Sequence, residues 1–251
     1  MTGAVAVADG AVPCAKVSEL EWNRPPESMR GLRLWLVDLD VRLDEHAQQW
    51  LGHSERDRAA RFVYERDARR YRAAHVALRQ LLLQHCGVQP GTEFEFGEHG
   101  KPRLSFSAPF EFNLSHSGER ALIGIGPGQG GGLGVDMEVL RDVEDVWPLA
   151  EQHFTAGECA QLRALPRAGV ARAFLTGWTR KEACLKALGC GLSVVPASFE
   201  VGLKPRAQMV VFDTAPGSAR VYVESVSAGA DMLVAVATVS PSWPTSRCIS
   251  I

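Results

Sequence analysis

The stretch "GPGQGGG", residues 126–132, divides this sequence into two comparable parts. On each side of it the chain follows the order strand, helices, strands, which predicts an α/β (α+β) fold of two similar halves. The tract lacks the GKS/T ending of a phosphate-binding loop and leads into a strand, so we interpret it as a flexible connection. The predicted domains are an irregular N-terminal segment, 1–30, and two α/β halves, 31–127 and 128–251.

Hydrophobic periodicity predicts the elements of each half. Before the tract, it indicates a strand at 32–41, a helical stretch over 54–86 and strands at 110–118 and 121–126. After the tract, it indicates a strand at 133–140 and helices around 145–153, 155–165 and 168–188. Further strands are predicted at 198–203, 208–213, 220–225 and 232–239.

The composition is typical of a globular protein without a charge-driven partner. The chain has 251 residues, 46% of them hydrophobic, and a net charge of −2, which gives no general attraction to nucleic acid or membranes. Arginines crowd into one segment, which is either a site for a phosphate-rich ligand or a solvated helix face; they are Arg56, Arg58, Arg61, Arg66, Arg69, Arg70, Arg72 and Arg79. Six cysteines without CxxC spacing indicate reduced thiols in a cytoplasmic protein. We find no convincing signal peptide or prenylation box.

Two carboxylates lie close together in "GVDMEVL", residues 134–140. Asp136 and Glu138 are two residues apart on a predicted strand, so their side chains leave the same face. Such a pair repels unless a cation lies between the two groups or one of them is protonated. Hard oxygen ligands in this arrangement suit Mg²⁺; the alternative is a solvent-facing acidic pair on an edge strand.

Ser115 and His116 stand together in "FNLSHSG", at the end of a predicted strand. A serine hydrolase is not favoured, because there is no G-x-S-x-G turn and chain neighbours rarely have nucleophile–base geometry. The histidine either donates to an anion or caps the turn.

The helix containing "WTRKEACLKALG", residues 178–189, places Glu182 at the edge of an apolar stripe. Lys186 follows one turn later, and Lys181 precedes the glutamate directly. A carboxylate in that position is costly unless a cation or hydrogen bond meets it. The alternative is a solvated Glu182–Lys186 pair.

Taken in order, five motifs resemble those of the 4′-phosphopantetheinyl transferases. They are GKP (100–102), FNLSHS (112–117), GVDME (134–138), F-x-x-x-E (154–158) and W-x-x-K-E-A-x-x-K (178–186). The resemblance covers about residues 55–205 and is to the monomeric, surfactin-synthetase-activating type, in the subgroup with KEA. It implies a pseudodimer of two α/β halves with the active site in the cleft between them.

The resemblance also implies a reaction: transfer of 4′-phosphopantetheine from coenzyme A to a serine of an apo acyl or peptidyl carrier protein, releasing adenosine 3′,5′-bisphosphate. Asp136, Glu138 and Glu182 would bind Mg²⁺, for which Mn²⁺ could substitute. Lys186 would contact the phosphate oxygens. Glu182, or Glu158 through a water, would be the general base. The implied protein is a cytoplasmic monomer that binds neither nucleic acid nor membranes.

The implied coenzyme A site draws on six residues: His116, Lys101, Ser115, Lys181, Arg70 and Arg58. Arg70 matches best among the arginines and Arg58 second, whereas one lysine of the family pattern falls at Glu55. Two other functions compete: a coenzyme A-dependent acyltransferase, which has no use for a carboxylate cluster, and an inert carrier-protein-binding module, which would be expected to have lost part of it.

Overall fold

The computed structural model describes residues 16–22, 29–97, 99–128, 132–214 and 217–240. These form two compact units. The smaller comprises residues 38–92 and the chain before Ser18, and the larger comprises residues 18–37 and the chain from Glu93 onward. The centre of the glycine tract, 129–131, and most of the predicted irregular N-terminal segment lie outside the described residues.

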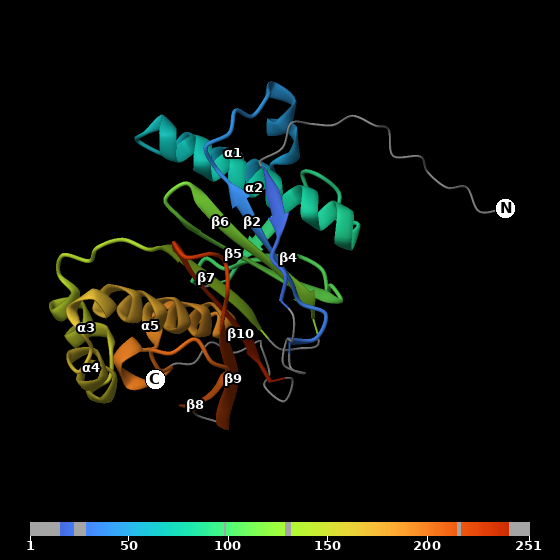
Figure 1. Ribbon diagram of the computed structural model, residues 1–251. Helices are drawn as coiled ribbons and strands as arrows, with labels where there is room; N and C mark the ends of the chain where they lie inside the picture. The colour runs from blue at the N-terminus through green and yellow to red at the C-terminus, as the bar shows by residue number, and fades with distance from the viewer. Residues whose placement is uncertain (1–15, 23–28, 98, 129–131, 215–216, 241–251) are drawn as a thin grey trace. The chain divides into compact units, whose positions relative to one another are not determined.

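The smaller unit is helical. Its elements are the 3-10 helix η2 (Glu45–Trp50), α1 (His53–Ala60) and α2 (Glu65–Cys86), which Figure 1 labels in part. The single helical stretch predicted over 54–86 is wrong, because the chain leaves the helix at Arg61 and is extended at Tyr64 before α2 begins. α2 ends at Gly87, whose φ of 71° is a left-handed conformation that glycine adopts without strain.

A buried charged cluster joins α1 to α2. Glu55 is fully buried, and its Oε2 accepts hydrogen bonds from Arg79 Nη2 at 2.8 Å and from the Gly52 backbone N–H at 2.7 Å. His75 Nδ1 lies 2.6 Å from Glu55 Oε1. A buried carboxylate is tolerated when cations and hydrogen bonds meet it in this way. Glu55, which stands where the family pattern has a lysine, therefore has a structural role in this chain.

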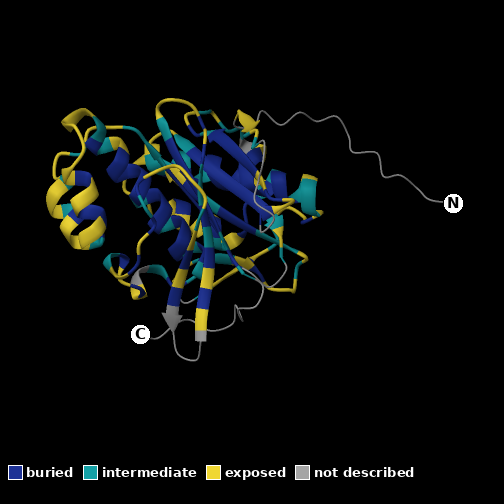
Figure 2. Cartoon of the chain, turned by 60° about the horizontal axis from the view of Figure 1, so that its bottom comes forward, coloured by how far each residue is buried: buried dark blue, intermediate teal, exposed yellow. Residues whose placement is uncertain are grey.

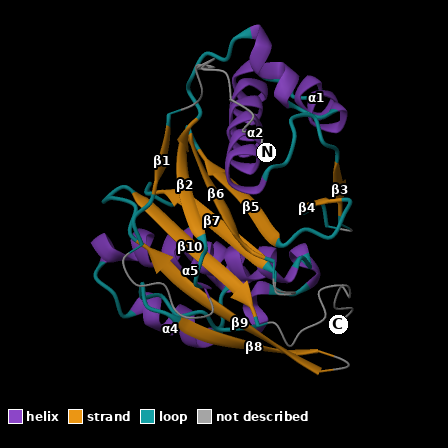
Figure 3. Ribbon diagram, turned by 90° about the vertical axis from the view of Figure 1, so that its right-hand side faces the viewer, coloured by secondary structure: helices purple, strands orange, loops and turns teal. Residues whose placement is uncertain are grey.

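The larger unit contains two four-stranded sheets (Figure 3). The first has the order β1-β2-β6-β5, with β1 (Val17–Glu19), β2 (Arg33–Asp38), β5 (Phe110–Ser117) and β6 (Arg120–Pro127). The second has the order β7-β10-β9-β8, with β7 (Leu133–Val139), β8 (Gln208–Thr214), β9 (Gly217–Val226) and β10 (Met232–Val239). A separate antiparallel pair consists of β3 (Phe94–Phe96) and β4 (Pro102–Leu104).

Helix α5 (Arg167–Leu188) packs on β7 and β10. Strands β6, β7 and β10 are mostly buried; Figure 2 draws buried residues in dark blue. Gly134 lets the helix approach closely, because a Cβ there would lie 2.0 Å from the carbonyl oxygen of Ala183. Helices α3 (Val146–His153) and α4 (Ala156–Arg163) precede α5.

The mixed helix-and-sheet class predicted from the sequence is confirmed, and α3, α4 and α5 occupy the three predicted helical ranges. The predicted strand at 198–203 is wrong. Its backbone N–H groups at Val201 and Gly202 donate to the Glu158 carboxylate instead of to a neighbouring strand. The compact units also divide the chain differently from the predicted halves, because β5 and β6 pack against β7 within one unit.

The predictions about membrane-spanning segments and about the cysteines can be compared with the described residues only. In the described part of the chain, no helix is long and apolar enough to cross a bilayer. Cys86, Cys159, Cys184 and Cys190 form no disulfide, whereas Cys14 and Cys248 lie outside the described residues.

Candidate active site

Asp136 and Glu138 leave the same face of β7, as their spacing predicts. They alternate with the buried Val135 and Met137, and they stand opposite Ala235 and Leu233 of β10. Asp136 is itself buried, and Glu138 is half-buried. The pair is therefore not the solvent-facing alternative.

Lys186 of α5 reaches this pair. Its Nζ lies 2.6 Å from Asp136 Oδ1 and donates to Ser115 Oγ at 3.0 Å. The close contact of α5 with Gly134 sets this distance, because Lys186 follows the contact residue Ala183 by three positions on the helix. The Lys186 ammonium thus binds a carboxylate of β7, so it is not merely half of a solvated Glu182–Lys186 pair on α5.

Glu182 shares the electrostatic environment of the β7 carboxylates. Burial raises its pKa above the usual range, the charges of Asp136 and Glu138 raise it further, and Lys186 acts in the opposite direction. Burial is also the largest cause of the raised pKa of Glu138, which its hydrogen bond to Ser117 lowers. The structure therefore places Lys186 against Asp136, with Glu138 on the same face of β7, and Glu182 close enough for the charges of all three to act on its carboxyl group.

Strand β5 presents a row of side chains to β7, of which only Ser115 was predicted to belong to the site. Ser115 Oγ donates to Asp136 Oδ1 at 2.7 Å, and Ser117 Oγ donates to Glu138 Oε2 at 2.7 Å. The Asn113 Oδ1 atom accepts from the Val135 backbone N–H at 2.8 Å. These positions alternate along β5, so all three side chains leave one face. The period-two pattern N-x-S-x-S is visible in the sequence, but the strand that it faces is not.

The donors at this site suit a hard divalent cation. Asp136 Oδ2 is buried and has no hydrogen-bond partner among the described residues. An orphaned carboxylate oxygen beside two acids of raised pKa is stabilised by added positive charge. Yet no group of three or more His, Cys, Asp or Glu side chains in the described ranges is arranged to hold a metal ion as it stands. The predicted ligands have the chemistry of a Mg²⁺ site without forming a finished cage.

Glu158 and Lys181 form a buried ion pair elsewhere on α4 and α5. Lys181 Nζ lies 2.8 Å from Glu158 Oε2, and the other oxygen, Oε1, accepts from the Val201 N–H at 2.8 Å. Lys181 also donates to the carbonyls of Pro196 and Phe199. Both side chains are buried and both are occupied by internal partners. This placement does not favour the predicted roles of Glu158 as a base and Lys181 as a coenzyme A ligand.

Replacing Glu158 by alanine is expected to destabilise the fold by about 3–5 kcal/mol, because it leaves the Lys181 ammonium buried without its partner. Urea denaturation measures this loss. The double variant Glu158→Leu/Lys181→Met, which removes both charges, should recover only part of it, because the Val201 and Gly202 backbone N–H groups still lose their acceptor. Glu158→Gln, assayed where it is folded, should keep kcat within a few-fold of the parent; a loss of activity without a loss of stability would restore the catalytic role.

Three predicted coenzyme A ligands of the larger unit lie in different surroundings. Ser115 is beside the carboxylates. Lys101 Nζ donates to the Leu133 carbonyl at 2.8 Å, at the start of β7, and burial lowers its pKa. His116 is exposed and stands between Ser115 and Ser117 on β5, so it points to the opposite face of the strand.

The two predicted arginines belong to the smaller unit. Arg70 binds Asp40 through Nε and Nη2 at 2.8 and 2.7 Å, which lowers the pKa of Asp40 to about 2. The guanidinium of Arg58 lies 5.7 Å from the centroid of the Tyr71 ring. Each guanidinium is held by a contact within the smaller unit: Arg70 by Asp40, and Arg58 by the ring of Tyr71.

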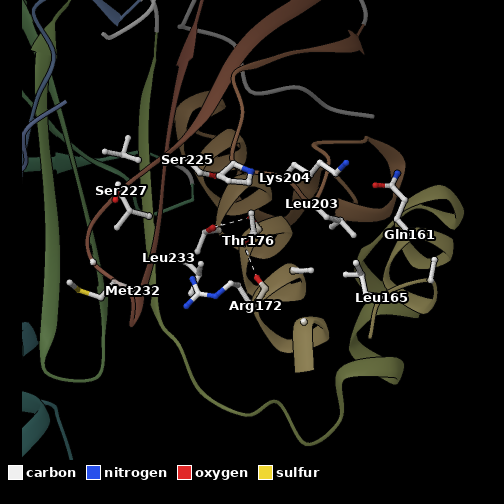
Figure 4. Close-up of a pocket in the computed structure, with 18 residues that line it drawn as sticks. Gln161, Leu165, Arg172, Thr176, Leu203, Lys204, Ser225, Ser227, Met232 and Leu233 are labelled. Atoms are coloured by element: carbon white, nitrogen blue, oxygen red, sulfur yellow. Dashed lines mark hydrogen bonds between the residues drawn. The ribbon is translucent and has the colours of Figure 1, made fainter. Parts of the chain in front are cut away.

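A cavity of about 860 Å³ lies along α5, bounded by α4, β9 and β10 (Figure 4). Its polar lining includes Gln161, Arg172, Thr176, Lys204 and Ser225. It contains no carboxylate and none of the predicted site residues. The cavity is therefore separate from the acidic cluster on β7.

Comparison with known proteins gives consistent matches. A family model described as the 4′-phosphopantetheinyl transferase superfamily matches residues 132–237, and one described as 4′-phosphopantetheinyl transferase, N-terminal, matches residues 44–125. The two models fit the predicted pseudodimer, since one follows the other along the chain.

Individual relatives carry the same name. The 4′-phosphopantetheinyl transferase HetI of Nostoc sp. is 35% identical over 181 residues, which cover 69% of this chain and 75% of HetI. AcpT of Salmonella typhimurium is 40% identical over 118 residues, 47% of this chain and 59% of AcpT. A 4′-phosphopantetheinyl transferase of Bacillus subtilis is 25% identical over 190 residues, 75% of this chain and 82% of that protein.

Proposed function

The chain belongs to the 4′-phosphopantetheinyl transferase superfamily, and we propose that it transfers 4′-phosphopantetheine from coenzyme A to a serine of an apo carrier protein in a Mg²⁺-dependent reaction. The observation that carries the proposal is the cluster of Asp136, Glu138 and Lys186, in which an ammonium and a buried carboxylate lie 2.6 Å apart. An inert binding module has no need to keep such a costly cluster of buried charged groups.

The reaction is a displacement at phosphorus. The serine oxygen of the carrier forms a bond to the phosphorus of the phosphopantetheine group, and the bond from that phosphorus to the bridging pyrophosphate oxygen breaks. The leaving group is adenosine 3′,5′-bisphosphate. Such a transfer needs positioning, neutralisation of the charge on the leaving phosphate and acceptance of the serine proton.

We assign these tasks to residues of the cluster. Asp136, Glu138 and Glu182 would hold the cation, which supplies charge neutralisation on the pyrophosphate when bound. Lys186 places a point charge where negative charge develops on the leaving side. Glu182 is the preferred base, because both oxygens of Glu158 are already occupied, one by Lys181 and the other by the Val201 backbone N–H.

Further features of the proposal come from the resemblance. The chain would be of the monomeric, surfactin-synthetase-activating type and the KEA subgroup, with halves divided between residues 127 and 128. The matched ranges 44–125 and 132–237 support this division. The acceptor would be an acyl or peptidyl carrier protein, and Mn²⁺ would substitute for Mg²⁺. Lys101, Ser115, His116, Arg58 and Arg70 would bind coenzyme A.

The test is direct. The protein is incubated with coenzyme A, Mg²⁺ and several apo carrier proteins, and intact-protein mass spectrometry detects the phosphopantetheine adduct. The expected result is an adduct on at least one carrier that disappears with excess chelator. With acetyl-coenzyme A, the whole acetyl-phosphopantetheine arm should be transferred. Transfer of the acetyl group alone would instead identify an acyltransferase, and no modification of any carrier would favour the binding module.

His116→Ala and Arg70→Ala are expected to raise the KM for coenzyme A more than they lower kcat. A contact with the 3′-phosphate is remote from the reacting phosphorus and serves mainly ground-state binding. Kinetics with coenzyme A and with 3′-dephospho-coenzyme A measure this difference. If a variant loses as much with the dephospho form as with coenzyme A, the residue does not bind that phosphate.

A further inference from the structure

The contact between β5 and β7 joins two sheet edges through side chains. Each strand is the edge of its own four-stranded sheet. An edge strand exposes backbone N–H groups that need partners. Here β5 side chains supply them: Glu111 accepts from the Leu133 N–H at 3.2 Å, Asn113 from the Val135 N–H at 2.8 Å, and Ser117 from the Val139 N–H at 3.2 Å.

Ser117 differs from the other members of this row because its hydroxyl makes two bonds to one short segment. Its Oγ accepts from the backbone N–H of Val139 and donates to Oε2 of Glu138 at 2.7 Å. A hydroxyl has one proton to donate and lone pairs to accept, so both bonds form together. The two bonds restrict the rotamer of Ser117 and, through it, the direction of the Glu138 carboxylate.

The two carboxylates of β7 depend on β5 to different degrees. Asp136 is bound by both Ser115 and Lys186. Within the described ranges, Ser117 is the hydrogen-bond partner of the Glu138 carboxylate. Loss of the Ser117 hydroxyl therefore leaves Glu138 free to rotate, whereas Asp136 keeps its other contacts.

We infer that Ser117 is a positioning residue that fixes the Glu138 carboxylate for cation binding by holding its side chain and the following backbone N–H. This inference rests on the proposed function, because it takes Glu138 as a ligand of the cation. Residues that orient metal ligands through hydrogen bonds typically change metal affinity or activity by about 10–100-fold when they are replaced. Ser117 makes a hydrogen bond of this kind to the Glu138 carboxylate.

The experiment measures cation binding directly. The full-length protein is saturated with coenzyme A in the absence of carrier, and free Mn²⁺ is followed by electron paramagnetic resonance. Ser117→Ala is expected to raise the Kd for Mn²⁺ by about 10–100-fold. Ser117→Thr, which keeps the hydroxyl, should stay within a few-fold of the parent. Ser198→Ala is the matched control, since Ser198 is exposed and its hydroxyl donates to the Val195 carbonyl.

Coenzyme A affinity without metal and the melting temperature separate positioning from other roles. Coenzyme A affinity without metal should be nearly unchanged in Ser117→Ala, and the melting temperature should fall only modestly, because the Val139 N–H loses its acceptor. Equal Mn²⁺ affinity in parent and Ser117→Ala, or equal loss in the threonine variant, would overturn this inference alone. So would a fall in coenzyme A affinity without metal, which would make Ser117 a substrate contact. Absence of Mn²⁺ binding by the parent would overturn the metal assignment of the proposed function, and this inference with it.

Discussion

Asp136→Ala is expected to reduce transfer below detection while the protein remains folded. Asp136 contributes one oxygen to Lys186 and Ser115 and has a second, buried oxygen without a hydrogen-bond partner among the described residues. Its loss removes a predicted cation ligand and the anchor of the lysine at once. Mass spectrometry of the carrier protein, over a series of Mg²⁺ concentrations, measures the effect.

Two further variants separate charge from packing. Asp136→Asn keeps the size of the side chain and should be as inactive as the alanine variant, because an amide cannot replace the carboxylate charge. Asp142→Asn makes the same charge change at an exposed position six residues further along and should retain activity. Circular dichroism and melting temperatures establish that each variant folds. Full activity of Asp136→Ala, or of the parent in excess chelator, would contradict the metal assignment.

The sequence predicted elements well where one physical rule acted alone. The apolar periodicity of residues 167–188 was long enough to predict α5, and the alternation around Asp136 predicted a strand with both carboxylates on one face. The break between α1 and α2 carries no proline or glycine, so local patterns continued the helix through Arg61 and Tyr64.

Predictions failed where a distant side chain decided the outcome. Val201 and Gly202 look like part of a strand, but their N–H groups bind Glu158, more than 40 residues earlier in the chain. The same contact gives Glu158 of the motif F-x-x-x-E a structural role, and its predicted role as a base stays a prediction. A conspicuous acid at regular spacing can be a buried partner, and only its neighbours in space distinguish this role from catalysis.

The contact of Ser117 with Glu138 could not be predicted from the sequence either. The alternation of Ser117 with Asn113 and Ser115 was present in the sequence, and the resemblance drew attention to Ser115 and His116 only. The bond to Glu138 depends on two sheet edges meeting, which no local pattern encodes. The sequence therefore identified most of the charged groups of the candidate site, and the structure was needed for the hydroxyls that orient them.

Lys186 has two interpretations with very different consequences. As an exposed partner of Glu182 one helical turn away, it would contribute only about 0.3–0.5 kcal/mol. The structure instead places its Nζ 2.6 Å from the buried Asp136, with 29% of the lysine side chain exposed. Removing it leaves the buried carboxylate of Asp136 without a cation, so we expect Lys186→Ala to lower stability by about 1.5–3 kcal/mol, the range for a hydrogen bond to a charged group.

The larger effect of Lys186→Ala is expected on the rate. In the proposed reaction its ammonium lies against a phosphate whose negative charge grows during transfer. Loss of one such electrostatic contact typically costs on the order of 10²–10³ in kcat. The measurement is kcat at saturating coenzyme A and carrier, at a temperature where the variant is folded, so that the loss of stability does not contribute.

The choice of controls decides between the two interpretations of Lys186. Lys204→Ala removes the same charge from an exposed position near α4 and α5 and should leave kcat unchanged. Lys186→Arg keeps the charge but replaces a compact ammonium by a planar guanidinium, so it should recover stability more than rate. A kcat of Lys186→Ala within a few-fold of the parent would reduce Lys186 to a structural partner of Asp136, and the charge on the leaving phosphate would then need another residue to stabilise it.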